Sequence, residues 1–584
     1  MRQVYSSLSV FLLIFGAAVG TATAQKDTTK LNQSVEVMKA YHPSIQNASK
    51  LNLMPVLDDT THFTPEFKYS INSRPVNAGF AASPIEAADV SRLPKKDLGL
   101  GYLKLGAGTL STLYGELFVN LPKSGIGTAG LHFKHLSSDA KTKLSEGDIV
   151  DAPYSKNNAG LFGTLNIGNT ILSADLSYNR DAMRYYGYPV AISENMPDQF
   201  GLKQAYQSGD LKIVLKSDEK NESDFMFNGG FNIGYFDAKT GQKQSSGGFF
   251  GKFGYNLGQV KGILGLSFDN LSTDGVHLGS GSVPGTRNET WLRVAPSVRL
   301  DGNNLTLRGG VRFVTVSSKG GEKMSRLYPD FELNFKPIEE MLTIYAGFNG
   351  DLKNNRYSDI AYENYWTDPH HNALNTDYTY IISGGLKGKI SGEISYNLGL
   401  KYSQAKDLYF YVMNSYDIIS SGTVPPPLIY NNAFDLTYDN AGITNFSAEF
   451  SYISGKDLSV VVKGNYYNYS LQSLAFAPEK PTFDLSLLTG FRIIERLTGF
   501  ADADIVGQRK ALIYHTSPLS SVLPSEQVLF IDPSIRLNLG ATYDITTNFK
   551  LFGRVDNLLN RQNEQWLGYP SQGLRLMAGI TLSF

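Results

Sequence analysis

Apolar and polar residues alternate along most of this chain, in segments of ten or more residues that recur from about residue 97 to Phe584. The final segment is the clearest, and its apolar positions are Leu574, Leu576, Ala578, Ile580, Leu582 and Phe584. A period of two is that of a β-strand, whose successive side chains point to opposite faces. Strands of soluble proteins usually have about 5–6 residues, whereas a tilted strand needs about 9–11 to cross a bilayer. The pattern therefore predicts membrane-spanning β-strands.

Short clusters of turn-forming residues separate these segments and alternate with longer polar connections. Ten tight turns are predicted, at residues 123–125, 166–169, 217–221, 256–258, 301–304, 336–337, 389–392, 454–457, 494–496 and 544–548. The longer connections include 137–156, 181–201, 354–376 and 507–532. Such alternation is typical of an outer-membrane barrel with short periplasmic turns and long outer loops. Ten turns imply eleven hairpins, so the predicted fold is all-β: a transmembrane outer-membrane β-barrel of about 22 antiparallel strands.

The first 24 residues are typical of a cleaved secretory signal peptide. Arg2 gives the positive start, an apolar run extends from Val10 to Val19, and Ala22-Thr23-Ala24 forms the small-residue exit. The apolar run is too short for the ~20 residues that a membrane-spanning helix needs. We therefore expect export through the Sec pathway and localisation in the cell outer membrane.

Charge and composition narrow the class of protein further. The 53 Lys+Arg residues nearly balance the 54 Asp+Glu residues, which gives no electrostatic reason to expect nucleic acid as a partner. The chain has no cysteine, which excludes disulfides and cysteine-ligated metal centres. Charged residues make up 18% of the chain, and this low share suits a surface that faces lipid. A soluble repeat fold such as a propeller is the alternative, but no repeated motif accompanies the regular spacing.

The C-terminal region resembles the closing strands of TonB-dependent outer-membrane receptors. The resemblance rests on the stretch from Leu551 to Asn560, which ends in Asn557-Leu558-Leu559-Asn560, on Gly568-Tyr569-Pro570, and on a final strand from Arg575 to Phe584. It implies a 22-stranded barrel, here assigned to residues 97–584, and an assembly machinery that reads the last strand. Ala578, Ile580, Leu582 and Phe584 are accordingly expected to face lipid and to guide barrel assembly.

The family also carries a globular plug domain before the barrel, and here only residues 25–96 lie between the signal peptide and the first strand. This segment has a proline about every ten positions, which disfavours a compact sheet. We expect a short extended segment that lines the lumen or docks a periplasmic partner; a disordered leader is the alternative. Without a plug, energy coupling by the family's mechanism does not follow from the resemblance.

The sequence contains no recognised catalytic motif: no Gly-x-Ser-x-Gly, no Gly-x4-Gly-Lys-Ser/Thr and no His-Glu-x-x-His. His370 and His371 beside Asp368 are suitable metal-ligand types, but adjacent side chains point apart, so a polar loop is the preferred interpretation. We expect no enzyme activity, no catalytic residue, no metal and no cofactor.

The connection 354–376 is the candidate for contact with the outside. It carries Tyr357, Tyr362, Tyr365 and Trp366. Exposed aromatic side chains suit contact with sugars or proteins, and they also form the girdles of barrels at the membrane interface. Both interpretations place these rings on the surface of the protein.

Two functions from different classes follow. The first is a receptor-like barrel that passes or binds a ligand at the outer membrane. The second is a structural subunit or scaffold of an outer-membrane assembly or secretion complex, with a periplasmic or outer-membrane protein as partner. Outer-membrane lipid and the barrel assembly machinery are expected partners of either. A barrel of this size has a wide lumen that is normally plugged, so residues 25–96, inward loops or a partner must fill it.

Overall fold

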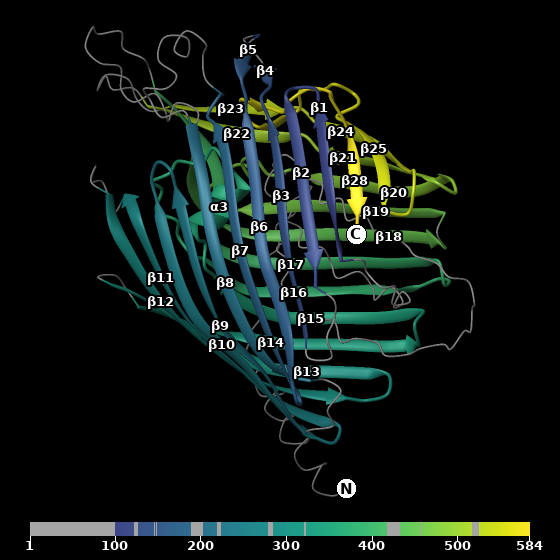
Figure 1. Ribbon diagram of the computed structural model, residues 1–584. Coiled ribbons are helices and arrows are strands. Elements are labelled where there is room, and N and C mark those ends of the chain that lie inside the picture. Colours follow the sequence, from purple (N-terminus) through teal and green to yellow (C-terminus); the bar gives the residue numbers. More distant parts are fainter. Residues whose placement is uncertain are drawn as a thin grey trace, which may run out of the picture. The chain divides into compact units, whose positions relative to one another are not determined.

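A computed structural model describes residues 100–121, 127–144, 147, 149–187, 203–218, 224–277, 284–319, 323–416, 433–455, 457–516 and 525–584. Twenty-two strands form the wall of one closed antiparallel barrel, as predicted (Figure 1). They are β1 (Gly101–Gly108), β2 (Thr112–Asn120), β3 (Gly127–Ser138), β6 (Tyr154–Ile167), β7 (Thr170–Arg184), β8 (Lys203–Ser217), β9 (Phe225–Ala238), β10 (Lys243–Leu257), β11 (Val260–His277), β12 (Pro284–Asp301), β13 (Leu305–Ser318), β14 (Lys323–Ile338), β15 (Leu342–Lys353), β16 (Thr376–Lys389), β17 (Ile394–Tyr416), β18 (Phe434–Ser454), β19 (Leu458–Leu471), β20 (Phe483–Ile494), β21 (Leu497–Val506), β24 (Ser534–Asp544), β25 (Phe549–Asp556) and β28 (Arg575–Ser583).

The barrel closes between its first and last strands. β28 pairs antiparallel with β25 on one side and with β1 on the other. The closing register places Leu103 opposite Leu582 and Ala107 opposite Ala578. Closure removes the free strand edges, whose unpaired backbone groups would be costly in hydrocarbon.

The two faces of the wall strands differ in polarity. On β28, Leu576 and Leu582 are exposed on the outside, whereas Arg575 and Met577 are buried on the lumen side. The same outward exposure of large apolar residues recurs around the wall, for example at Phe249, Leu400 and Phe446. Apolar outside and polar inside is the arrangement of a barrel that spans the outer membrane, and the protein is located there. No helix among the described residues is long and apolar enough to cross a bilayer.

The predicted turns that fall on described residues lie at one end of the barrel, which we call the turn side. The turn predicted at 123–125 and parts of those at 217–221 and 454–457 lie outside the described residues. Tight connections join successive strands there, for example at 168–169, 258–259, 302–304 and 495–496. The turn expected at 336–337 is displaced, because β14 continues to Ile338 through a bulge. The remaining connections lie at the opposite end, the loop side.

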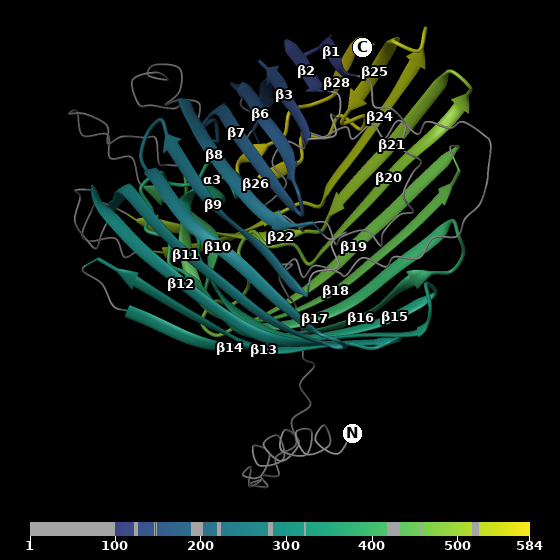
Figure 2. The same cartoon turned by 60° about the horizontal axis from the view of Figure 1, so that its bottom comes forward.

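Short connections also occur on the loop side, at 109–111 and 239–242. The long ones contain further structure. They hold β4 (Lys141–Lys143), β5 (Ile149–Asp151), α3 (Tyr357–Glu363), β22 (Arg509–Thr516), β23 (Ser525–Ile531), β26 (Glu564–Trp566) and β27 (Tyr569–Pro570). In Figure 2, α3 and β26 lie inside the ring of wall strands. The boundaries predicted for the signal peptide and for the segment 25–96 fall outside the described residues.

Candidate functional site: an aromatic cap and the cavity beside it

The loop side of the barrel is filled by its own connections. We call the following set the cap: the described parts of 139–153, 185–187, 354–375, 472–482, 507–533 and 557–574. Apolar side chains from all of these connections except 472–482 form one buried cluster with residues of the inner wall, including Tyr206 on β8, Tyr411 on β17 and Phe434 on β18. Ala477, in 472–482, belongs to a second buried cluster. The first cluster joins walls on different sides of the lumen, so the cap is packed like a protein core.

The helix α3 lies in this cluster because of its own apolar spacing. Tyr357, Ile360 and Ala361 follow the i, i+3, i+4 pattern of one helix face, and all three are buried. The helix has no side-chain cap at its N-terminus. A helix of seven residues is not stable alone in water, so its contacts with the barrel wall hold it in place. This spacing was the available sequence signal that the connection 354–376 folds inward.

The predicted surface position of the four aromatic residues differs from the structure. Tyr357, Tyr365 and Trp366 are only 2%, 8% and 5% exposed, and Tyr362 is partly buried against the same cluster. They therefore form neither an exposed contact surface nor a girdle facing lipid. The reason is that the lumen offers apolar partners from several strands, and burial of an aromatic side chain is strongly favourable. Whether they contact a ligand stays a prediction.

Tyr365 ties the cap to the wall on one side. Its hydroxyl donates to Asp181 on β7 at 2.5 Å and accepts from Nζ of Lys156 on β6 at 3.0 Å. The hydroxyl of Tyr206 on β8 donates to the backbone carbonyl of Tyr365 at 2.9 Å. Burial raises the pKa of Tyr365 well above its ordinary value, with Asp181 acting in the same direction, so this hydroxyl stays a donor.

Trp366 joins two loops within the cap. Its indole stacks on Tyr569, with ring centroids 4.0 Å apart, and its Nε1 donates to the carbonyl of Arg184 at 2.9 Å. Tyr186 packs edge-on against both rings, and its hydroxyl donates to the carbonyl of Pro570 at 2.9 Å. Three connections of the barrel therefore meet at Trp366.

A buried ion pair holds the opposite part of the cap. Arg509 on β22 lies 3.3 Å from a carboxylate oxygen of Glu479, and both side chains are almost fully buried. Arg509 also donates to the carbonyls of Gln565 and Glu564 at 2.6 Å each, while Glu479 accepts from the backbone N–H of Leu567 at 3.2 Å. Burial raises the pKa of Glu479 to about 7, although Arg509 acts in the opposite direction.

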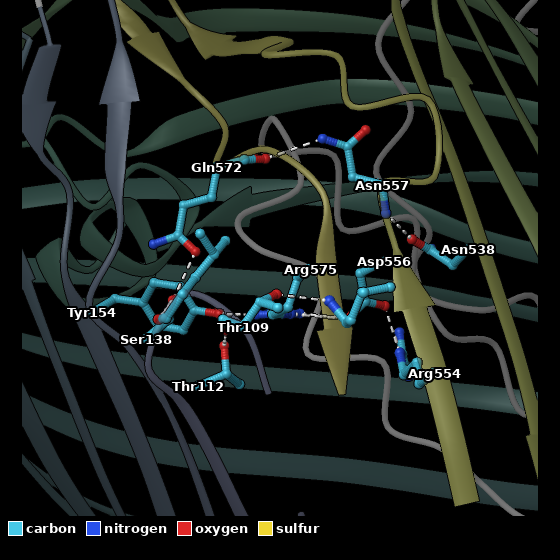
Figure 3. Close-up of polar contacts among 12 residues, drawn as sticks. Thr109, Thr112, Ser138, Tyr154, Asn538, Arg554, Asp556, Asn557, Gln572 and Arg575 are labelled. Atoms are coloured by element: carbon cyan, nitrogen blue, oxygen red, sulfur yellow. Dashed lines mark hydrogen bonds and ion pairs between the residues drawn. The ribbon is translucent and has the colours of Figure 1, made fainter. Parts of the chain in front are cut away.

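A cavity lies between the cap and the lumen wall formed by β6, β7, β24, β25 and β28. Its volume is about 100 Å³. Arg554, Asp556 and Arg575 form its polar wall (Figure 3). Both oxygens of Asp556 are engaged: Arg554 Nε donates to Oδ1 at 2.5 Å, and Arg575 donates to Oδ2 at 2.7 and 3.0 Å. Arg575 also donates to the hydroxyl of Tyr154.

The C-terminal motif Asn557-Leu558-Leu559-Asn560 begins the loop after β25, and its Asn557 lines this cavity. Asn557 and Asn560 adopt left-handed backbone conformations (φ 53° and 50°), which Asn tolerates better than most residues. The side chain of Asn557 donates to the carbonyls of Arg561 and Gln572 at 2.7 and 3.1 Å (Figure 3). The motif therefore fixes the loop that carries Tyr569 into the cap.

The two adjacent histidines do not form a metal site in the structure. His370 stacks on His277 and contacts the carbonyl of Gly275, whereas His371 pairs with Asp435 and Tyr438. Within the described part of the chain, no group of three or more His, Cys, Asp or Glu side chains is placed to hold a metal ion.

The barrel is similar to solved structures of outer-membrane transporters and receptors. The FrpB iron transporter from Neisseria meningitidis is 12% identical, with 85% of this chain and 83% of that chain covered and a TM-score of 0.62. The pyoverdine outer-membrane receptor FpvA from Pseudomonas aeruginosa PAO1, bound to pyoverdine, is 13% identical, with 84% and 80% covered and a TM-score of 0.60. The barrel has the fold of the TonB-dependent outer-membrane receptors.

The copper transporter OprC gives a third TonB-dependent-receptor match, at 11% identity with 84% and 82% covered and a TM-score of 0.57. No protein-family model matches the chain, and no curated protein matches it in sequence. The likeness is therefore one of three-dimensional fold. It confirms the resemblance that the C-terminal residues carry.

Proposed function

We propose that the protein is a gated outer-membrane barrel that passes a ligand through its lumen, with the cap as the gate in its closed position. The observation that carries the proposal is the buried cluster of the cap, which extends from Tyr206 on one wall to Tyr411 and Phe434 on another. A barrel of this size without such a filling would leave the cell permeable. The cap supplies that filling from the barrel's own connections.

The relatives in fold support a transport role. The matched structures are described as iron and copper transporters and as receptors for a siderophore. A shared fold does not determine function, and the feature of this barrel that supports transport is the cap. A gate must open, and the cap consists of connections between wall strands, the parts of a barrel that rearrange most easily. Opening must also separate β22 from β17, with which it pairs in parallel.

Opening can be measured by labelling a buried position of the cap with a small thiol reagent. Ala361→Cys places a single cysteine on the fully buried face of α3, in a chain that has none of its own. In the folded, heat-modifiable barrel we expect slow but complete labelling, because the cap opens while the wall stays intact. The matched control is Val314→Cys, at a fully buried position outside the cap cluster, which should react only after unfolding.

A structural scaffold is the second candidate, and one observation favours it. The cap is held by the buried pair Glu479–Arg509 and by Lys480, whose Nζ lies 3.2 Å from Glu363. One related structure is a complex of the FpvAI receptor with pyocin S2, so a barrel of this fold can bind a protein partner. If Ala361→Cys stays unlabelled as long as Val314→Cys does, the cap never opens and the scaffold is the better account.

A further inference from the structure

We infer that the cavity beside the cap binds a small organic anion that carries a flat apolar face. The inference deepens the proposed function by naming the ligand class. Its first support is the balance of charge among the cavity-lining side chains. With Arg536 left aside, because it lies opposite Asp504 in the strand register, Lys156, Arg554 and Arg575 are cationic, and Asp181 and Asp556 are anionic, so three positive charges face two negative ones.

The ion pairs of the cavity wall leave positive charge in excess. Asp556 is shared by two guanidinium groups, Arg554 and Arg575, so one carboxylate balances two cations. Lys156 and Asp181 balance each other through their common contact with Tyr365. Arg536 on β24 also lines the cavity and lies opposite Asp504 on β21 in the strand register, so its charge is not part of this excess. A guanidinium group binds carboxylate, phosphate or sulfonate through a planar fork of donors.

The rest of the lining is apolar and aromatic. Leu136, Met183, Tyr186 and Trp366 contribute to the same cavity. Small-molecule sites commonly combine such a lining with a few convergent polar groups. Because the cap shields one side of the cavity, an anion there experiences a stronger field than it would in water. An inorganic anion would contact only the arginine side chains, whereas an anion with an aromatic ring would contact both the arginines and the apolar lining.

The test uses three matched quenchers of tryptophan fluorescence on the purified full-length barrel in detergent. They are 4-nitrobenzoate, 4-nitrobenzamide and 4-nitrobenzylammonium, which share a ring and differ in charge. We expect 4-nitrobenzoate to bind at least tenfold more tightly than the amide, and the ammonium probe to bind most weakly. Chloride at high concentration should weaken the binding of 4-nitrobenzoate by screening. Equal affinity of the three probes in the wild-type barrel would overturn the inference without any variant.

The double variant Arg536→Gln/Arg554→Gln removes two positive charges from the cavity wall. It should lose about tenfold or more in affinity for 4-nitrobenzoate while its affinity for the amide stays within twofold. The matched control Lys252→Gln/Arg299→Gln removes the same charge from lumen-side positions of β10 and β12 outside the cavity, and it should bind as the wild type does. An equal loss in both variants would show a general effect of lumen charge and contradict a specific site.

The outcomes for the site and for the gate are separable. Labelling of Ala361→Cys without preferential binding of 4-nitrobenzoate would support the gate and contradict the anion site. Preferential binding of 4-nitrobenzoate without any labelling of Ala361→Cys would support the anion site and contradict the transport role.

Discussion

The indole ring of Trp366 lies flat against the phenol ring of Tyr569, with ring centroids 4.0 Å apart and an interplanar angle of 21°. Trp366 belongs to the connection after β15, and Tyr569 to the connection after β25. The stack therefore links two loops from distant parts of the barrel wall. Both rings belong to the buried cluster of the cap.

The closing strand gives a first prediction. Leu582 is exposed on the lipid face of β28, and Phe584 exchanges backbone hydrogen bonds of 2.9 and 3.0 Å with Gly101. Leu582→Asp places a charge against lipid. Deletion of Phe584 removes the last hydrogen bonds of the seam, the pairing between β28 and β1. Both changes should sharply lower the amount of folded, heat-modifiable barrel in the outer membrane. Ser583→Asp on the lumen face should be mild. Equal tolerance of the three changes would mean that the face assignment is wrong.

The seam between β28 and its neighbours also depends on a glycine. A Cβ on Gly579 would overlap the carbonyl oxygen of Leu105 and lie 2.6 Å from the ring of Phe552, whereas a Cβ on Gly553 would meet nothing within 4 Å. Gly579→Ala should therefore slow barrel closure and reduce the yield of folded protein, while Gly553→Ala leaves it unchanged. The yield after refolding into detergent, read from heat-modifiable migration, checks the pair. A normal yield for Gly579→Ala would show that the seam can shift to accept a methyl group.

The orientation of the barrel gives a third prediction. Long loops of outer-membrane barrels face the outside of the cell, and Ile149 on the loop side is 66% exposed. Ile149→Cys should react with a membrane-impermeant thiol reagent on intact cells, whereas Asn303→Cys on the turn side should react only after the cells are broken. Fast labelling at Asn303 and none at Ile149 would invert the topology.

The wall of the barrel was predictable from the sequence because its causes are local. The alternation in Leu576, Ala578 and Ile580 fixes the strand and its outward face, since a period of two leaves one choice of side for each residue. Turn chemistry such as Asp301-Gly302-Asn303 marks the hairpins in the same local way.

The cap could not be predicted in the same way. Aromatic residues such as Tyr365 and Trp366 are equally compatible with an exposed loop, a membrane girdle or a packed interior. Their burial depends on partners far away in the sequence, such as Asp181 and Tyr569. Arg554, Asp556 and Arg575 lie on the lumen face of β25 and β28, and their convergence around Asp556 depends on the three-dimensional register of the two strands.

The buried carboxyl of Glu479 gives a pH dependence of the cap. Burial raises its pKa from an ordinary 4.5 to about 7, with Arg509, Glu564 and Lys480 as its charged neighbours. A raised pKa means that the closed cap takes up a proton, so this stabilisation is complete below about pH 4.5 and is lost as the pH rises through 7. The cap should open more readily at pH 8 than at pH 5, by about tenfold or more.

The labelling rate of Ala361→Cys measures this change when it is divided at each pH by the rate of the exposed Ile149→Cys, which removes the pH dependence of the thiol itself. Glu479→Gln keeps an acceptor for the N–H of Leu567 but cannot titrate, and it should flatten the profile. An unchanged profile in Glu479→Gln would assign the pH dependence to another group.

The conductance of single barrels in planar lipid bilayers tests the central claim, that the cap closes the lumen. Removal of a buried aromatic ring costs about 3–5 kcal/mol, so Trp366→Ala and Tyr569→Ala should shift the cap strongly toward open states. We predict that the wild-type barrel is silent, that both variants show discrete openings, and that Trp291→Ala, which removes a fully buried indole outside the cap cluster, stays silent. Steady large conductance of the wild type, or silence of both cap variants in folded barrels, would contradict the account.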